Sequence, residues 1–102
     1  MATAFVQEFA IVDGDTSTTN YDAVAAELGR TAPAGLIVHT AGFDRDRGVF
    51  RIMDVWESRE AGQRFMDETL MPIIERMASE HAPEDFRPPD AESWYKLHDI
   101  LP

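Results

Sequence analysis

The sequence contains no cysteine among its 102 residues. Disulfide bonds, thiolate metal sites and cysteine nucleophiles are therefore excluded, and this absence fits a reducing compartment such as the cytoplasm. Basic residues are also scarce, because 9 Lys and Arg stand against 19 Asp and Glu, for a formal net charge of −10. Phosphate backbones and anionic membrane surfaces repel such a chain, so we expect neither nucleic acid nor a membrane as a partner.

Long apolar runs are missing as well. No stretch approaches the roughly 20 apolar residues of a membrane-spanning helix. The N-terminal stretch MATAFVQEFAIV lacks a basic start and includes Glu8, so it does not resemble a signal peptide. There is no glycine-rich phosphate loop and no G-x-S-x-G elbow. Apolar residues still make up 44% of the chain, and its length predicts a single domain over residues 1–102, small enough to favour an oligomer.

The N-terminal part predicts a strand and then a short helix. Residues 3–12 carry apolar side chains on both faces at period two, which is typical of a central strand buried on both sides. After the polar loop DGDTSTTN, we expect Thr19 or Asn20 to cap a helix that ends near Gly29. Its apolar face would carry Tyr21, Val24, Ala25 and Leu28.

The middle of the chain predicts a hairpin followed by a helix. Strand candidates at residues 36–43 and 49–57 flank the polar turn DRDRG, the pattern of an antiparallel hairpin. Ser58 is expected to cap a long amphipathic helix, in which Pro72 predicts a kink or a two-piece helix with the proline near the start of the second piece. The apolar side of this helix carries Phe65, Met66, Leu70, Ile73, Ile74 and Met77.

The last part of the chain predicts a loop and a strand. Residues 81–93, starting at His81, are acidic and proline-rich and would form an ordered excursion or a mobile loop, before a strand at residues 94–101. The element order β-α-β-β-α-β predicts an α+β, ferredoxin-like fold, with a four-stranded antiparallel sheet and both helices on one face. The other face would stay bare. Because exposed apolar sheet faces usually mark interfaces, we expect two copies to pair through it.

Two residues of the hairpin are candidates for proton transfer. If Trp56 faces the helices, alternation places Asp54 on the same side, among Phe50 and Ile52, where desolvation would suit a general acid or base. The alternative is a structural carboxylate paired with a neighbouring Arg or a helix N-terminus.

The role of His39 depends on how the hairpin pairs. A turn centred between Arg45 and Asp46 would place His39 opposite Ile52 and diagonal to Asp54, so that the two form an orienting pair able to move protons. A shifted register would send His39 to the other face, as a core or interface residue.

The segment D-V-W-E-S, at residues 54–58, lies between a hairpin strand and an amphipathic helix. With G-L-I at residues 35–37, it resembles the dimeric α+β barrel superfamily, most closely the antibiotic-biosynthesis monooxygenases. The resemblance implies a homodimer of ferredoxin-like protomers, each with a small-molecule pocket between its sheet and its own helices. It also implies cofactor-independent oxygenases or cyclases acting on aromatic or polyketide-like substrates.

Individual positions follow this resemblance only in part. In the quinone-forming oxygenases the tryptophan of the motif lines the pocket, and Trp56 matches it. The asparagine four residues earlier is Ile52 here, and the tyrosine six residues later is Gly62. The haem-degrading branch ligates iron through a histidine on the second helix, which this helix lacks, so we expect no haem.

Several further residues are candidates for binding a small-molecule ligand. Trp56, Phe65, Met66 and Leu70 would form an apolar wall or simply core. Gln7 would orient a carbonyl, and Tyr21 would close the pocket mouth. His39, His81 and His98 belong to three separate elements, so we expect no metal site and no cofactor. The residues leave two hypotheses: an enzyme that abstracts a proton before oxygenation or rearrangement, and a non-catalytic ligand-binding or structural homodimer.

Overall fold

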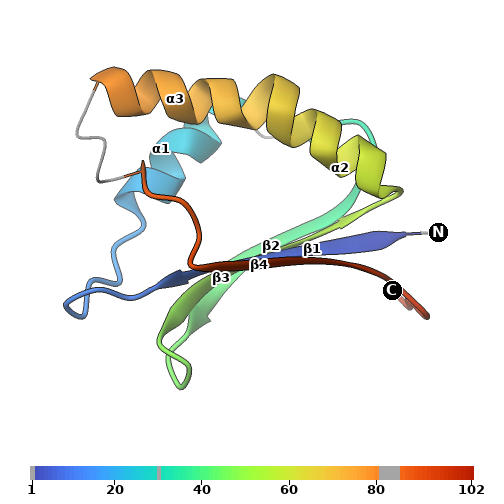
Figure 1. Cartoon of the computed structure of the whole chain (residues 1–102), viewed down its shortest axis with the longest axis horizontal. Coiled ribbons are helices and arrows are strands. Elements are labelled where there is room, and N and C mark those ends of the chain that lie inside the picture. The colour runs from blue at the N-terminus through green and yellow to red at the C-terminus, as the bar shows by residue number, and fades with distance from the viewer. Residues whose placement is uncertain (1, 30, 81–85) are drawn as a thin grey trace.

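The computed structural model describes residues 2–29, 31–80 and 86–102 (Figure 1). Its elements are β1 (Thr3–Ala10), α1 (Thr19–Leu28), β2 (Leu36–Asp44), β3 (Val49–Trp56), α2 (Arg59–Phe65), the π-helical turn η1 (Met66–Leu70), α3 (Met71–Glu80) and β4 (Ala91–Lys96). The strands pair antiparallel in the order β2-β3-β1-β4. Helix α1 and the continuous rod α2-η1-α3 lie over the same face of this sheet. The predicted α+β ferredoxin-like fold is confirmed.

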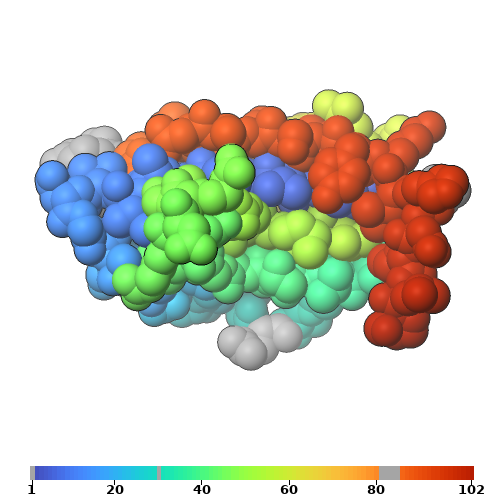
Figure 2. Space-filling model, turned by 90° about the horizontal axis from the view of Figure 1, so that it is seen from below, coloured from blue at the N-terminus to red at the C-terminus, as the bar shows by residue number. Residues whose placement is uncertain are grey.

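The opposite face of the sheet carries no helix. Figure 2 looks onto this open face, where the strands present side chains at the surface and the C-terminal residues lie along one edge. Val38 and Tyr95 point to this side, because their neighbours His39 and Trp94 face the helices, and both are large exposed hydrophobic residues. Helices therefore cover only one face of the sheet.

The packed core lies between the sheet and the helices, toward the end where α2 begins. Trp56 is 1% exposed and pairs with Thr3 of the central strand β1. Phe5, also buried, stacks on Trp94 of β4 with ring centroids 3.9 Å apart. Burying aromatic side chains of this size contributes about 1.5–3 kcal/mol each, so Trp56 and Phe5 are a main source of stability for so small a domain.

The hairpin of β2 and β3 pairs differently from the expected register. The turn is centred between Asp46 and Arg47, where the Arg47 N–H donates to the Asp44 carboxylate at 3.1 Å. Gly48 closes the turn with a left-handed φ of 67°. The turn centre thus lies one residue later than expected, which shifts the pairing by two residues. His39 consequently lies opposite Asp54 rather than Ile52, on the same face as expected.

The second helical segment follows the expectations closely. The Ser58 hydroxyl accepts a hydrogen bond from the Ala61 N–H at 3.1 Å, as a helix cap does. Pro72 is the second residue of α3, and α3 follows directly on the π-helical turn η1. A proline lacks the N–H that would continue the α-helical ladder, and the wider turn before it accommodates this break. The predicted interruption is thus a π-helical turn within one continuous rod, with Pro72 near the start of the part that follows it.

Other element boundaries differ from those expected. β1 ends at Ala10 rather than at residue 12, and Thr18 occupies the cap position of α1 without a side-chain capping bond. β4 begins at Ala91 rather than at residue 94, because the preceding Asp90 already joins β1 through its N–H to Glu8 O at 2.8 Å. It ends at Lys96, well short of residue 101. The expected start of the loop at His81 lies outside the described residues. Within the described ranges, no helix combines the length and the apolar character needed to cross a membrane.

Candidate functional site

Three side chains from three different elements form a continuous hydrogen-bonded chain. The Tyr21 hydroxyl of α1 lies 2.6 Å from Nε2 of His39 on β2. Nδ1 of the same imidazole lies 2.5 Å from Oδ1 of Asp54 on β3. We call Tyr21, His39 and Asp54 the relay.

Local pairing explains why the relay forms. His39 and Asp54 are direct partners in the antiparallel pair of β2 and β3, so their side chains leave the sheet side by side. Tyr21 lies in the first turn of α1, on the side that meets the sheet. Its ring contacts Phe50 edge-on, with centroids 5.4 Å apart, and Phe50 in turn packs against Phe43 at 4.9 Å. These phenylalanines give the relay an aromatic border.

Charge fixes the protonation pattern of the imidazole. An ionised carboxylate only accepts hydrogen bonds, so the Asp54 contact assigns a proton to Nδ1 of His39. This hydrogen bond is the main cause that raises the pKa of His39 above its usual value; partial burial opposes it, and the negative charge of Asp54 adds to it. The His39 side chain is 41% exposed and that of Asp54 13%. Solvent therefore reaches the imidazole while the carboxylate behind it is shielded.

The phenol and the imidazole meet end to end. Their ring planes are within 3° of parallel, yet the centroids are 6.2 Å apart and the contact joins Oη to Nε2. Face-to-face stacking would bring ring atoms, rather than one hydroxyl and one nitrogen, into contact. The hydroxyl thus approaches the edge of the imidazole, where the Nε2 lone pair or N–H lies. With neutral His39 the phenol donates to Nε2, and with protonated His39 Nε2 donates to the phenol.

Trp56 lies in a different environment from the one a ligand platform needs. Its ring contacts Phe65 at a centroid distance of 5.4 Å, and its Nε1 is buried without a hydrogen-bond partner in the described structure. A Cβ placed on Gly62 would come within 2.9 Å of both Trp56 and Trp94. The indole is therefore enclosed by core side chains, and the space expected beside it for a ligand is filled.

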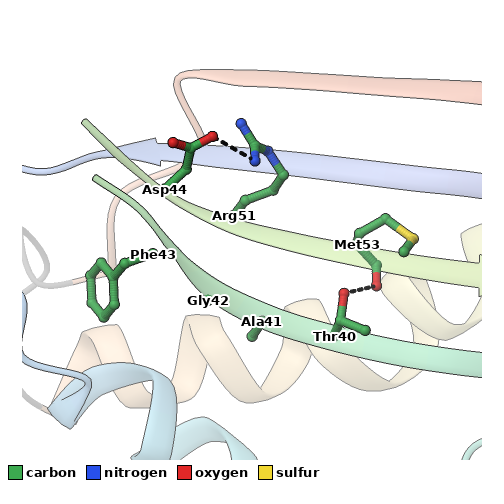
Figure 3. Close-up of a pocket in the computed structure, with 7 residues that line it drawn as sticks. All are labelled: Thr40, Ala41, Gly42, Phe43, Asp44, Arg51 and Met53. Carbon is green, nitrogen blue, oxygen red and sulfur yellow. Dashed lines mark hydrogen bonds and ion pairs between the residues drawn. The ribbon is translucent and has the colours of Figure 1, made fainter. Parts of the chain in front are cut away.

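Two shallow hollows of the described residues lie elsewhere. One, of about 290 Å³, is a shallow depression along the β2–β3 hairpin (Figure 3). There Asp44, Arg51, Thr40 and Met53 point to the open face, while Phe43 points toward the helices. The Arg51 guanidinium already forms ion pairs with two carboxylates, Asp44 at 3.0 Å and Glu8 at 2.6 Å. The other hollow runs along α1 and is lined by Asp22, Ala25, Ala26 and Gly29.

The remaining predicted binding residues lie on β1 and η1. Gln7 is 9% exposed and pairs with Ile52 in the centre of the sheet. Met66 and Leu70 lie in η1 and are half-buried. His98, after β4, is exposed. Among the described residues no group of three His, Cys, Asp or Glu is placed to hold a metal ion.

Sequence reasoning missed three residues that shape the site. Alternation with Asp54 placed Phe50 on the same face, but the sequence did not indicate its contact with Tyr21. Phe43 joins the border only because it pairs with Phe50, which depends on the hairpin register. Trp94 gave no signal of its own, since its stacking on Phe5 depends on how β4 pairs with β1.

Comparison with known proteins was made on both sequence and structure. No protein-family model matches the sequence, and no curated protein matches it significantly. Among solved structures, Rv0793 from Mycobacterium tuberculosis superimposes with a TM-score of 0.69 at 16% identity, covering all of both chains. A protein from Chloroflexus aurantiacus J-10-fl, assigned as an antibiotic biosynthesis monooxygenase, gives 0.62 at 16% identity over 100% of this chain and 98% of its own. This chain has an antibiotic-biosynthesis-monooxygenase-like fold.

A third structure with this monooxygenase-like fold is a mutant of SnoaB, a cofactor-independent oxygenase from Streptomyces nogalater. It matches with a TM-score of 0.62 and 17% identity, over 99% of this chain and 97% of its own. The sequence resemblance to the quinone-forming oxygenases implies a tyrosine at position 62, where this chain has glycine. The 2.9 Å approach of a Cβ to two tryptophans leaves no room for a larger side chain.

Proposed function

We propose that this protein is a small-molecule enzyme that works by proton transfer without a cofactor, with the relay of Tyr21, His39 and Asp54 as its centre. The observation that carries the proposal is the pair of short hydrogen bonds that joins the three residues in line, at 2.6 and 2.5 Å. A base oriented by a carboxylate on one nitrogen and bonded to a hydroxyl on the other is the arrangement that hydrolytic triads use for proton transfer.

Each part of the relay has a separate task in this proposal. Asp54 holds the imidazole in the tautomer with the proton on Nδ1 and stabilises the imidazolium that forms after proton uptake. His39 stores the substrate's proton, which its raised pKa favours. Phe50 and Phe43 border the site with aromatic surface, which suits a flat ligand better than a sugar or a peptide.

The substrate would be a phenol, an enol or a related polyketide-like aromatic. Loss of a proton to the relay leaves an electron-rich anion. That anion can add dioxygen at carbon to give a hydroperoxide, which loses water to form a quinone, or it can rearrange or cyclise without oxygen. The fold shared with SnoaB supports the oxygen-dependent route, because that protein is a cofactor-independent oxygenase.

A second candidate is a non-catalytic ligand-binding or structural protein of the same fold. The enclosure of Trp56, at 1% exposure, favours it, because core side chains occupy the space where a deeply bound ligand would lie. In this alternative the relay is a polar contact that joins α1 to the sheet.

We further propose that the chain acts as a homodimer, a dimeric α+β barrel, formed through the open sheet face and working in the cytoplasm. Val38 and Tyr95 are 41% and 50% exposed on that face, an unusual cost for a monomer. The lack of cysteine is consistent with that compartment.

The test compares His39→Gln and Asp54→Asn with the parent on a hydroxyanthrone, a naphthol and a cyclic 1,3-diketone, following substrate absorbance and dissolved oxygen. Losing a positioned acid–base group costs about 10²–10⁴-fold in rate, so we expect at least a hundredfold loss in kcat. His98→Gln is the matched control, an exposed histidine outside the relay. Equal turnover by all four proteins, or binding without turnover by the parent, would favour the second candidate.

A further inference from the structure

We propose that α1 is a lid, which detaches from the sheet as one unit while the strands and the rod α2-η1-α3 stay folded. In the closed state α1 lies over the hairpin of β2 and β3, where Tyr21 contacts His39 and Phe50 (Figure 1). Neither of the two hollows described above is lined by a residue of the relay. Detachment of α1 would uncover His39 and Phe50. The inference goes beyond the proposed function, because it holds whether the relay transfers protons or only joins α1 to the sheet.

The packing of α1 against the sheet is loose. None of its ten residues, all of which the structure describes, is buried, whereas the rod places Gly62 and Met77 in the core. The apolar residues Val24 and Leu28 of α1 are only half-buried. Ala41 of β2 shares the helix-covered face with its partner Ile52, yet it is exposed. Because stabilisation by burial follows the apolar area removed from water, α1 adds less of it than the rod does.

The described contacts that hold α1 in place are mostly polar. Its first turn is joined to the sheet by the 2.6 Å contact between the Tyr21 hydroxyl and His39, and by the edge contact of the Tyr21 ring with Phe50. Near its last turn, Glu27 pairs with Arg76 of α3 at 2.9 Å, and both side chains are nearly half exposed. Exposed ion pairs contribute little to stability. Tyr21 therefore links α1 to both strands of the hairpin, and we call it the latch.

Fixed points on either side of α1 limit how far its detachment would spread. Before α1, the Ile11 N–H donates to the carbonyl that closes the hairpin turn, at 2.9 Å. After α1, the Gly35 carbonyl accepts the N–H that follows β3, at 2.8 Å. Gly29, which ends α1, has a left-handed φ of 78°, and a Cβ there would meet no described atom within 4 Å. The chain can change direction at that point without disturbing a packed neighbour.

A detached α1 would also lose its helical structure. Helices shorter than about 12–15 residues are marginal in water, and α1 has ten. Thr18 gives it no side-chain cap, and its last turn contains no basic residue to interact with the helix dipole. Detachment and unwinding should therefore occur together. All backbone amides of α1 would then become open to hydrogen exchange in a single event, which makes the opening measurable.

The first experiment is native-state hydrogen exchange of the whole chain, followed by NMR at increasing low concentrations of urea. We expect the amides of residues 23–28 to share one opening equilibrium, at least about tenfold more populated than that of the central strand β1. Its dependence on urea should be weaker than that of β1, because less surface is exposed. Amides of α1 that match β1 in both respects, or that open one by one without a common urea dependence, would overturn the inference.

The second experiment repeats this exchange on two variants. Tyr21→Phe removes the hydroxyl of the latch and keeps its ring, so we expect the open population of α1 to rise about two- to tenfold. Ser58→Ala is the matched control. It removes the cap bond of α2, which persists when α1 is open, so it should raise the opening of β1 about two- to thirtyfold and leave that of α1 unchanged.

Two outcomes would contradict the lid. If Ser58→Ala raises the opening of α1 as much as that of β1, then α1 opens only when the whole molecule unfolds. If Tyr21→Phe leaves the opening of α1 unchanged, Tyr21 is not the latch. The comparison of the parent with Ser58→Ala stands even where Tyr21→Phe does not fold. The proposed function is tested by turnover, and its failure would leave these exchange results as they are.

Discussion

His39 and Asp54 combine three properties that a structural ion pair seldom shares. They are joined at 2.5 Å, the carboxylate is shielded at 13% exposure, and the imidazole stays open to solvent at 41%. Exposed ion pairs contribute little to stability because water and salt screen them. The pair instead fixes which nitrogen carries the proton, as the proposed proton transfer requires.

The raised pKa of His39 predicts how stability depends on pH. In the unfolded chain the histidine titrates near about 6.5, and the Asp54 hydrogen bond raises the folded pKa above that value. Proton binding thus stabilises the fold fully below about pH 6.5, and this contribution is lost as pH rises through the folded pKa. Asp54→Asn removes it. Urea unfolding should show a larger gap in free energy of unfolding between the parent and Asp54→Asn at pH 6 than at pH 9.

The control for that measurement is His98→Gln, whose difference from the parent should stay the same at both values of pH. A gap between the parent and Asp54→Asn that does not change with pH would show that the carboxylate does not favour the protonated imidazole.

For Gly62→Ala we expect a change in the free energy of unfolding opposite in sign to the change that helix propensity predicts. On propensity alone, Gly→Ala inside a helix stabilises by about 1 kcal/mol. At Gly62 the new Cβ would lie 2.9 Å from Trp56 and from Trp94, and such overpacking costs about 1–3 kcal/mol. We therefore expect Gly62→Ala to lower the free energy of unfolding by up to about 2 kcal/mol, measured by urea or thermal unfolding.

Gly42→Ala is the matched control, since a Cβ there meets nothing within 4 Å. Alanine in that strand should be neutral or should stabilise by up to about 1 kcal/mol. If Gly62→Ala and Gly42→Ala both stabilise the fold, the side chains of Trp56 and Trp94 can shift at little cost. The space beside Trp56 could then open for a ligand.

Among the elements, α1 and α2 begin differently although both follow a hydroxyl residue. Ser58 accepts the Ala61 N–H, whereas the Thr18 hydroxyl donates to the Asp22 carboxylate and caps no backbone group. Ser58→Ala should therefore lower the free energy of unfolding by about 0.5–2 kcal/mol. Thr18→Ala should cost clearly less in the same urea titration. Equal losses would show that the cap bond of Ser58 contributes nothing specific.

The elements themselves were predictable because local signals set them. Alternation marked the strands, the hydroxyl of Ser58 marked the start of α2, and Pro72 marked the break in the long helix. The hairpin register was not predictable in the same way. The Asp44 side chain captures the Arg47 N–H and moves the turn centre by one residue, a choice among turns that the DRDRG segment permits equally well.

The site was predictable only to the level of strand pairs. Sequence placed His39 and Asp54 on neighbouring strands and one face, but it joined Tyr21 to neither, because that contact depends on where α1 lies over the sheet. The predicted role of Trp56 depended on an open space, and space is set by distant residues. Gly62 and Trp94 close it, and the contact between them follows from the pairing of β4 with β1.

For the molecule as a whole, the open face of the sheet is the feature that is hardest to reconcile with a monomeric state. A standard interface buries roughly 800 Å² on each partner, about a ninth of the 6949 Å² that this chain exposes. A four-stranded sheet face is large enough to supply that area. Arg51 already pairs with Glu8 and Asp44 on that side. Burying these paired charges in an interface would cost less than burying unpaired ones.

This predicts that one charge on the open face separates the protomers. Sedimentation of the parent at micromolar concentration should give the mass of a dimer, and Val38→Arg should give that of a monomer, because an unpaired guanidinium would be buried against the partner. Met71→Arg, at an apolar residue 37% exposed on α3, is the matched control and should stay dimeric. A monomeric parent, or a dimer that survives Val38→Arg, would place any self-association elsewhere. The relay could then be tested in a single protomer, because no partner would be needed to hold its sheet.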